Sequence, residues 1–166
     1  MAAYNEWMNG RMYAVCAELP DDERRRDRGA FFKSIHGTLN HLLLADKVWL
    51  GRFLGEPFAV KSLDQELFHD FEELRGARAE TDRQIVEWAA TLTDEVLAGP
   101  LHYVTISNPA PRSVEMWLAV THFFNHQAHH RGQLTALLSQ CGKDYGVTDL
   151  LALPEAILRS AAAPTA

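Results

Sequence analysis

A cluster of histidines in the second half of the chain has the residue type and the spacing to bind a metal ion. Residues 121–134 read THFFNHQAHHRGQL, so four of the eight histidines lie in this one stretch. In an α-helix, neutral imidazoles at positions i and i+4 can direct ring nitrogens to one divalent ion. The pattern HxxxH occurs twice, at 122/126 and at 126/130. The spacing therefore indicates a metal site without deciding which histidines are the ligands.

The apolar stripe of this predicted helix separates the four histidines. His126 and His130 point in the same direction as the apolar residues, which are Met116, Ala119, Phe123, Leu134 and Leu137. His122 and His129 lie toward the edge of the stripe. An unpaired buried imidazole costs about 1–3 kcal/mol, and a shared metal ion provides a partner for both inward histidines. Core histidines bonded to carbonyl groups, or a histidine-lined dimer contact, remain open alternatives on spacing alone.

A metal site needs a third ligand, and the other four histidines are not equally suitable. His41 flanks the apolar side of an earlier predicted helix and is the best third ligand. His36 instead groups with Asn40 on the polar side of that helix. His69 lies in an acid-rich segment where exposure is expected, and His102 lies in a strand-like segment as a distant fourth possibility.

Four further residues near the predicted site have competing interpretations. Gln133 shares the arc of the inward histidines and can orient a ligand or substrate. The favoured interpretation is that Gln133 is simply a polar residue at the open end of the bundle. Trp49 and Phe123 can line a pocket, but core packing is favoured for both. Arg131 lies away from the ligand face and is predicted to be a salt-bridge or interface residue.

Helical periodicity dominates the chain and predicts the scaffold of this site. Helices are predicted at roughly 3–18, 30–54, 63–91 and 114–141, with Ser62 and Ser113 as N-caps of the last two. The segment 99–113 predicts one or two short strands and a turn. A short helix is expected near 153–161. The pattern predicts an all-α four-helix bundle, with one domain over 1–160 and a flexible tail at 161–166.

Composition disfavours several classes of protein. The 166 residues are 47% hydrophobic and 23% charged, with a formal net charge of −6. This acidic balance argues against binding to nucleic acid. No apolar stretch has the length to span a bilayer and the N-terminus lacks signal-peptide features, so we expect no membrane contact and a cytoplasmic location. Cys16 and Cys141 match no CxxC pattern and are predicted to be reduced thiols.

Three segments together resemble the DinB family of damage-inducible, or YfiT-like, metalloenzymes. They are YNEWMNGRMY at 4–13, SIHGTLNHLLLADKVWL at 34–50 and THFFNHQAHHRGQLTALL at 121–138. The combination of NHxxxAD with a later HxxxHRGQ is specific, although neither half is specific alone. The resemblance implies a four-helix bundle, commonly a homodimer, in which His41, His126 and His130 hold a divalent ion such as zinc, nickel or iron.

The resemblance and the ligand set lead to two hypotheses about function. Three neutral ligands leave the charge of an ion uncompensated and one coordination position open, which is typical of catalytic sites. The favoured hypothesis is a metal-dependent enzyme acting on a small molecule, either as a hydrolase or, like some relatives, as a thiol-S-transferase that uses a low-molecular-weight thiol. The alternative is a non-catalytic dimeric protein that binds metal or a ligand in a stress response.

Overall fold

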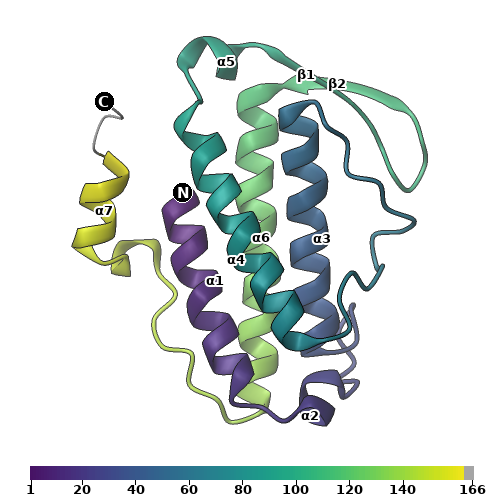
Figure 1. Cartoon of the computed structure of the whole chain (residues 1–166), viewed down its shortest axis with the longest axis vertical. Coiled ribbons are helices and arrows are strands. Elements are labelled where there is room, and N and C mark those ends of the chain that lie inside the picture. Colours follow the sequence, from purple (N-terminus) through teal and green to yellow (C-terminus); the bar gives the residue numbers. More distant parts are fainter. Residues whose placement is uncertain (163–166) are drawn as a thin grey trace.

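Apolar residues at spacings of three and four form four long helices, which pack as a bundle in the computed structural model (Figure 1). The structure describes residues 1–162. Both α1 and α3 pack against α4 and α6, so the apolar faces of all four helices enclose the core. This arrangement confirms the predicted all-α four-helix bundle. The long helices are α1 (Ala2–Ala17), α3 (Ile35–Leu54), α4 (Phe71–Ala90) and α6 (Met116–Gln140).

The order of the helices requires one long crossover. In Figure 1, α1 and α6 run down the bundle while α3 and α4 both run up it. Two consecutive parallel helices cannot be joined by a tight turn, so residues 55–70 run back along the length of the bundle. This connection passes beside α3, where it contributes to the candidate site.

The start of α4 differs from the prediction. The helix predicted from residue 63, with Ser62 as N-cap, begins at Phe71. Asp70 is the N-cap, because its carboxylate accepts hydrogen bonds from the backbone N–H groups of Glu72 (2.8 Å) and Glu73 (2.9 Å). An aspartate next to an acidic first turn thus caps the helix, and the earlier serine belongs to the crossover.

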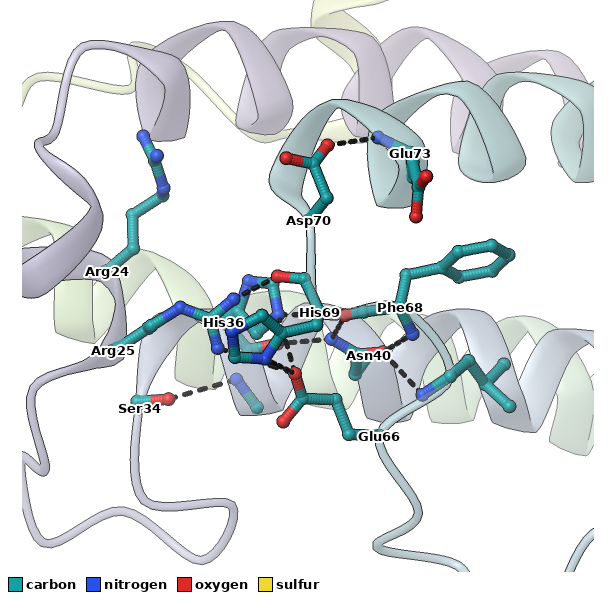
Figure 2. Close-up of polar contacts among 12 residues, drawn as sticks. Arg24, Arg25, Ser34, His36, Asn40, Glu66, Phe68, His69, Asp70 and Glu73 are labelled. Carbon is teal, nitrogen blue, oxygen red and sulfur yellow. Dashed lines mark hydrogen bonds and ion pairs between the residues drawn. The ribbon is translucent and has the colours of Figure 1, made fainter.

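Two polar residues of α3 hold the crossover in place (Figure 2). Asn40 Oδ1 accepts hydrogen bonds from the backbone N–H groups of Leu67 (2.8 Å) and Phe68 (3.0 Å). The carbonyl of Phe68 lies 3.1 Å from Asn40 Nδ2 and 2.9 Å from His36 Nε2. His36 and Asn40 thus share the polar side of the helix as predicted, but that side does not face solvent, because the crossover covers it and buries both residues.

The start of α3 is also later than the predicted residue 30. Residues 28–33 turn back on themselves, with Lys33 in the left-handed conformation (φ 65°), and the helix begins at Ile35. Ser34 is the N-cap, and its hydroxyl accepts a hydrogen bond from the N–H of Gly37 at 3.0 Å. The predicted end is confirmed, since Gly55 follows Leu54 with φ 74°.

Shorter elements complete the chain. The antiparallel strands β1 (Pro100–Val104) and β2 (Pro111–Glu115) confirm the strands predicted in 99–113. Ser113 lies in β2, so it does not cap α6, which begins at Met116 rather than 114. The C-terminal helix expected near 153–161 is α7 (Glu155–Ala162), preceded by the 3₁₀ turn η1 (Leu150–Ala152).

Among residues 1–162, two short α-helices lack any counterpart in the sequence pattern, as does η1. The two helices are α2 (Asp21–Arg25) and α5 (Asp94–Ala98), which are too short to show periodicity. Of the tail predicted at 161–166, residues 161 and 162 belong to α7, and 163–166 lie outside the described residues. Within residues 1–162, no helix combines the length and apolarity needed to cross a membrane.

A buried polar cluster joins the four long helices. Arg78 of α4 contacts Asp46 of α3 at 2.5 Å and Asp82 of its own helix at 2.9 Å. Asn9 of α1 donates a hydrogen bond to Asp82 (2.9 Å), and Gln127 of α6 donates one to Asp46 (2.8 Å). All five residues are at most 5% exposed. Such a network is geometrically demanding, so it sets the register of the helices against one another.

The same cluster explains the position of Arg131. This residue is buried and donates a hydrogen bond to Asn5 of α1, so the prediction of a salt-bridge or interface residue is wrong. Gln127, which donates a hydrogen bond to Asp46 of α3, directly follows His126 in α6. It therefore aligns α3 with α6 at the level of the candidate ligands.

Candidate metal centre

Three histidines of α3 and α6 come together in the bundle. His41, His126 and His130 each offer a ring nitrogen, and these atoms all lie within 4.8 Å of one another. The Nε2 atoms of His126 and His130 are 3.1 Å apart. His41 and His130 are buried, and His126 is half-buried. The structure thus brings together the three residues that the sequence predicts as ligands, and within residues 1–162 no other group of histidine, cysteine or acidic ligands lies as close.

The crossover determines the tautomer of His41. Its Nδ1 lies 2.9 Å from the carbonyl oxygen of Leu63, and because a carbonyl can only accept, Nδ1 carries the proton. The other nitrogen, Nε2, therefore presents a lone pair. This atom is buried and has no hydrogen-bond partner among the described residues, a state that costs about 1–3 kcal/mol. Coordination to a metal ion would remove that cost.

Gln133 determines the tautomer of His130 in the same way. Its side-chain nitrogen lies 3.2 Å from Nε2 of His129, and its Oε1 lies 2.8 Å from Nδ1 of His130. Since the amide oxygen only accepts, Nδ1 of His130 is protonated and Nε2 is left as the ligand atom. Gln133 thus orients His130. Of its two predicted roles, orienting a ligand was less favoured than that of a polar residue at the open end of the bundle.

Burial keeps the three imidazoles neutral. Desolvation lowers the pKa of His41 from 6.5 to about 4, against the opposing effect of its bond to Leu63. Desolvation, reinforced by the neighbouring imidazoles, lowers the pKa of His126 to about 3. The pKa of His130 is also lowered, chiefly by burial. Neutral imidazole is the form that binds divalent metals, so near pH 7 all three side chains are in their ligand form.

The donor set fits a divalent transition metal. Imidazole suits zinc, nickel and iron alike. Nitrogens about 2.0–2.1 Å from a tetrahedral ion lie about 3.3 Å apart, and the Nε2 atoms of His126 and His130, at 3.1 Å, already match this spacing. Two ring nitrogens at this distance form a hydrogen bond only if one of them carries a proton. His130 is protonated on Nδ1, so in the absence of an ion the proton is on Nε2 of His126. A metal ion would replace that proton and provide all three imidazoles with a common partner.

Phe32 covers this group of imidazoles. Its ring stacks on His41 with 3.8 Å between centroids and an interplanar angle of 16°, and its edge meets His130 at 5.5 Å. The turn before α3 places the ring there. That turn passes so close to the helix that a Cβ atom at Gly37 would overlap the carbonyl oxygen of Phe32. The glycine is therefore required for the close approach of the covering segment.

Two cavities meet at the histidines. One has a volume of about 420 Å³ and the other about 870 Å³, and both are lined by His41 and His126. The smaller cavity extends to Trp49 of α3 and to the β1–β2 hairpin, whereas the larger extends to Phe32 and the crossover. The site is thus concave, with one cavity on the side of the hairpin and another on the side of the crossover.

Comparisons with known proteins identify the family. Residues 1–160 match the DinB family. The chain belongs to this family. Protein DinB of Bacillus subtilis (strain 168) is 27% identical over 154 residues, which cover 88% of this chain and 87% of that protein. A crystal structure of a DinB-like protein from Bacillus cereus ATCC 10987 has the same fold, with a TM-score of 0.65 and 21% identity over 87% of this chain and 90% of the other.

The other histidines of this DinB family member lie outside the group of three. His122 and His129 are exposed, as predicted from the edge of the apolar stripe, and so are His69 and His102. His36 is buried, but its bond to the Phe68 carbonyl directs it toward the crossover. Near the site, Phe123 is a core residue as predicted, whereas Trp49 is half-buried and lines the smaller cavity.

Sequence reasoning missed two contributors to the site. The carbonyl of Leu63 has no side-chain signature, and its role depends on a crossover that the pattern assigns to a helix. Phe32 is likewise assigned to a helix, although it belongs to the preceding turn. One signal was available, since Asn40 precedes His41 in the NHxxxAD motif and anchors the crossover that carries Leu63.

Replacing Gln133 by leucine is expected to weaken divalent metal binding about 10–100-fold, the effect usual for loss of a group that orients a ligand. The substitution removes the acceptor that holds the proton on Nδ1 of His130. Competition with a chromogenic chelator measures the affinity. Gln140→Leu, at an exposed position of the same helix, is the matched control and should bind like the wild type. Equal affinities of the two variants would contradict the role of Gln133.

Proposed function

We propose that this DinB family member is a metal-dependent enzyme in which His41, His126 and His130 hold a divalent ion such as zinc, nickel or iron. The proposal is carried by the buried Nε2 of His41, which has a lone pair, no partner within residues 1–162, and two neutral imidazoles beside it. Three protein ligands are typical of catalytic sites, whereas structural zinc sites normally have four.

The residues around the site support chemistry on a small molecule. When bound, the ion supplies Lewis acidity and an open position at which water or a thiol becomes a better nucleophile. Leu63 and Gln133 hold protons on the Nδ1 atoms of two ligands, and Phe32 shields His41 from solvent. The two cavities favour a reaction between two small molecules, such as transfer of a low-molecular-weight thiol to an electrophile, and also allow hydrolysis.

Metal analysis tests the proposal directly. Protein purified without a nickel column is expected to contain about one divalent ion per chain by plasma mass spectrometry, in line with a three-histidine site. His126→Ala is expected to contain almost none, while His122→Ala, at the exposed position one turn earlier, should keep its metal. Wild-type metal content far below one, or equal content in His126→Ala, would rule out the site.

Turnover separates this enzyme from the alternative of a non-catalytic metal- or ligand-binding dimer. Bacillithiol, mycothiol or glutathione is offered together with an electrophile, and hydrolysable esters are tested in parallel. We expect turnover by the wild type that His41→Ala loses along with its metal. Binding without metal-dependent turnover across the whole panel would favour the alternative. Sedimentation tests the homodimer that we propose on the basis of the family resemblance.

A further inference from the structure

The smaller cavity beside the histidines carries charges that metal binding does not explain. Two arginines, Arg52 and Arg112, line this cavity, and no aspartate or glutamate does. Its other ionisable side chains are histidines and Tyr103. The chain as a whole has a net charge of −6. A concave site with only positive charges in an acidic protein is suited to an anion. We refer to this space as the arginine cavity.

Aromatic rings hold Arg52 at the wall of the arginine cavity. Its guanidinium carbon lies 4.5 Å from the ring centroid of Trp49 and 4.4 Å from that of Tyr103. Stacking of this kind restrains the planar group without using its N–H donors. Among the described residues its side chain makes one hydrogen bond, from Nη2 to the carbonyl of Val104 at 3.3 Å, and no ion pair. Most of the five donors thus remain available to a ligand.

Arg112 lies close to this stack on the neighbouring strand. In the register of the hairpin it is directly opposite Tyr103. Its side chain forms no hydrogen bond or ion pair with any residue in the range 1–162. Most other arginines pair with carboxylates; these are Arg24, Arg25, Arg26, Arg28, Arg75, Arg78, Arg83 and Arg159. Like Arg52 and Arg112, Arg11 and Arg131 have no acidic partner in the described part of the chain, but Arg11 bonds to the carbonyls of Tyr145 and Val147 and Arg131 bonds to Asn5. Arg52 and Arg112 are therefore the arginines whose guanidinium groups are least engaged by the described residues.

The hairpin holds these groups in a fixed relation. In the loop between β1 and β2, the N–H of Thr105 donates to the carbonyl of Ala110 (3.1 Å), and the N–H of Ala110 donates to Thr105 Oγ1 (3.0 Å). The loop itself lines the cavity, facing apolar side chains of α3 such as Ala45 and Val48. The walls thus combine an aromatic and aliphatic surface with two cationic groups.

We propose that the arginine cavity binds the anionic group of a small organic substrate, a carboxylate or a phosphate, through Arg52 and Arg112. Planar guanidinium groups bind both anions through paired N–H donors, while the aromatic and aliphatic walls accept the body of the molecule. Because His41 and His126 line the same cavity, the opposite end of the molecule reaches the candidate metal centre. This assignment of substrate class rests on the proposed function, but the anion site itself requires no metal.

Calorimetric titration with three aromatic probes tests the anion site. Benzoate and phenyl phosphate carry the two candidate anions, and benzamide is the neutral counterpart of benzoate. Each is titrated into the protein as purified and into chelator-treated protein. We expect at least one anion to bind about tenfold or more tightly than benzamide in both preparations, since charge-assisted hydrogen bonds are the stronger ones. The preferred anion identifies the substrate class.

Variants assign the binding to the two arginines. Arg52→Gln and Arg112→Gln are each expected to weaken binding of the preferred anion about tenfold, without changing metal content. Arg112→Gln is informative even if Arg52→Gln folds poorly, because Arg112 is exposed, whereas Arg52 is half-buried. Arg75→Gln, on the exposed face of α4, is the control and should bind like the wild type.

Anions that bind no more tightly than benzamide, or that bind equally well to Arg112→Gln and to the wild type, would overturn the proposal. Failure of the metal proposal produces a different result. In that case metal content is low, yet arginine-dependent anion binding persists in the chelator-treated protein. Binding that disappears on chelation and is unaffected by the arginine variants would assign the anion to the metal instead, and would also overturn the arginine site.

Discussion

Replacing Arg78 by methionine is expected to lower the free energy of unfolding by about 3–5 kcal/mol, the usual effect of breaking a buried ion pair by removing one partner. The guanidinium contacts Asp46 at 2.5 Å and Asp82 at 2.9 Å, and all three groups are buried. Methionine fills part of the space but leaves two carboxylates without a counter-charge. Urea denaturation at pH 7 measures the change.

The pH dependence of this loss provides a second test. Burial raises the pKa of Asp46 and Asp82 above the ordinary value, and the charge of Arg78 opposes this effect. Without Arg78 the two pKa values should rise further. A carboxyl group whose pKa is raised in the folded state stabilises that state fully below its unfolded pKa, near 4, and less as the pH rises. The deficit of Arg78→Met is therefore expected to be smaller at pH 4.5 than at pH 7.

The control for this substitution lies on the same helix. Arg75→Met removes an exposed guanidinium that pairs with Glu72 at 3.6 Å, and such pairs contribute little. We expect its free energy of unfolding to change by less than about 0.5 kcal/mol. A comparable loss in both variants, independent of pH, would mean that the buried charges are not what the substitution at position 78 disturbs.

The candidate ligands could be predicted because their positions follow from local periodicity. His126 and His130 share an apolar stripe that can be read from the residues of one helix, and His41 flanks a similar stripe on another. Helix faces depend on sequence spacing alone, so the three side chains were found without the topology. The same reasoning placed His122 and His129 toward the edge of the stripe, and in the structure both are exposed.

The residues that orient the ligands could not be predicted in the same way. Leu63 acts through a backbone carbonyl, and its place depends on a crossover forced by two consecutive parallel helices. Ser62 and Gln65 resemble a capping box, but the helix starts where Asp70 supplies a carboxylate next to Glu72. Local patterns show where a helix can begin, and tertiary contacts decide where it does.

The same limit applies to the polar residues of α3. His36 and Asn40 show only as a polar face in the sequence, because the segment that buries them is distant and its pattern predicts a helix instead of a crossover. Their hydrogen bonds go to backbone groups of Phe68 and Leu67, which any residue type could supply. A polar face of a helix therefore indicates either solvent or a chain segment that needs hydrogen-bond partners.

Replacing Gly37 by alanine is expected to destabilise the protein by about 1–3 kcal/mol, the cost of overpacking, and to weaken metal binding. The added Cβ would overlap the backbone carbonyl of Phe32, which cannot move without shifting the whole turn before α3. Because the Phe32 ring stacks on His41, the shift disturbs the orientation of a ligand. Thermal unfolding and chelator competition measure the two effects.

A second glycine of the bundle is the matched control. Gly76 lies on the exposed side of α4, and apart from the adjoining backbone of its own helix no atom lies within 4 Å of the position that a Cβ would take, so Gly76→Ala meets no obstacle. Alanine there should stabilise the protein by about 0.5–1 kcal/mol, because it restricts the unfolded chain. The two substitutions are chemically identical and are expected to have opposite signs. A stabilising Gly37→Ala that binds metal normally would show that the segment carrying Phe32 adjusts freely and does not position His41.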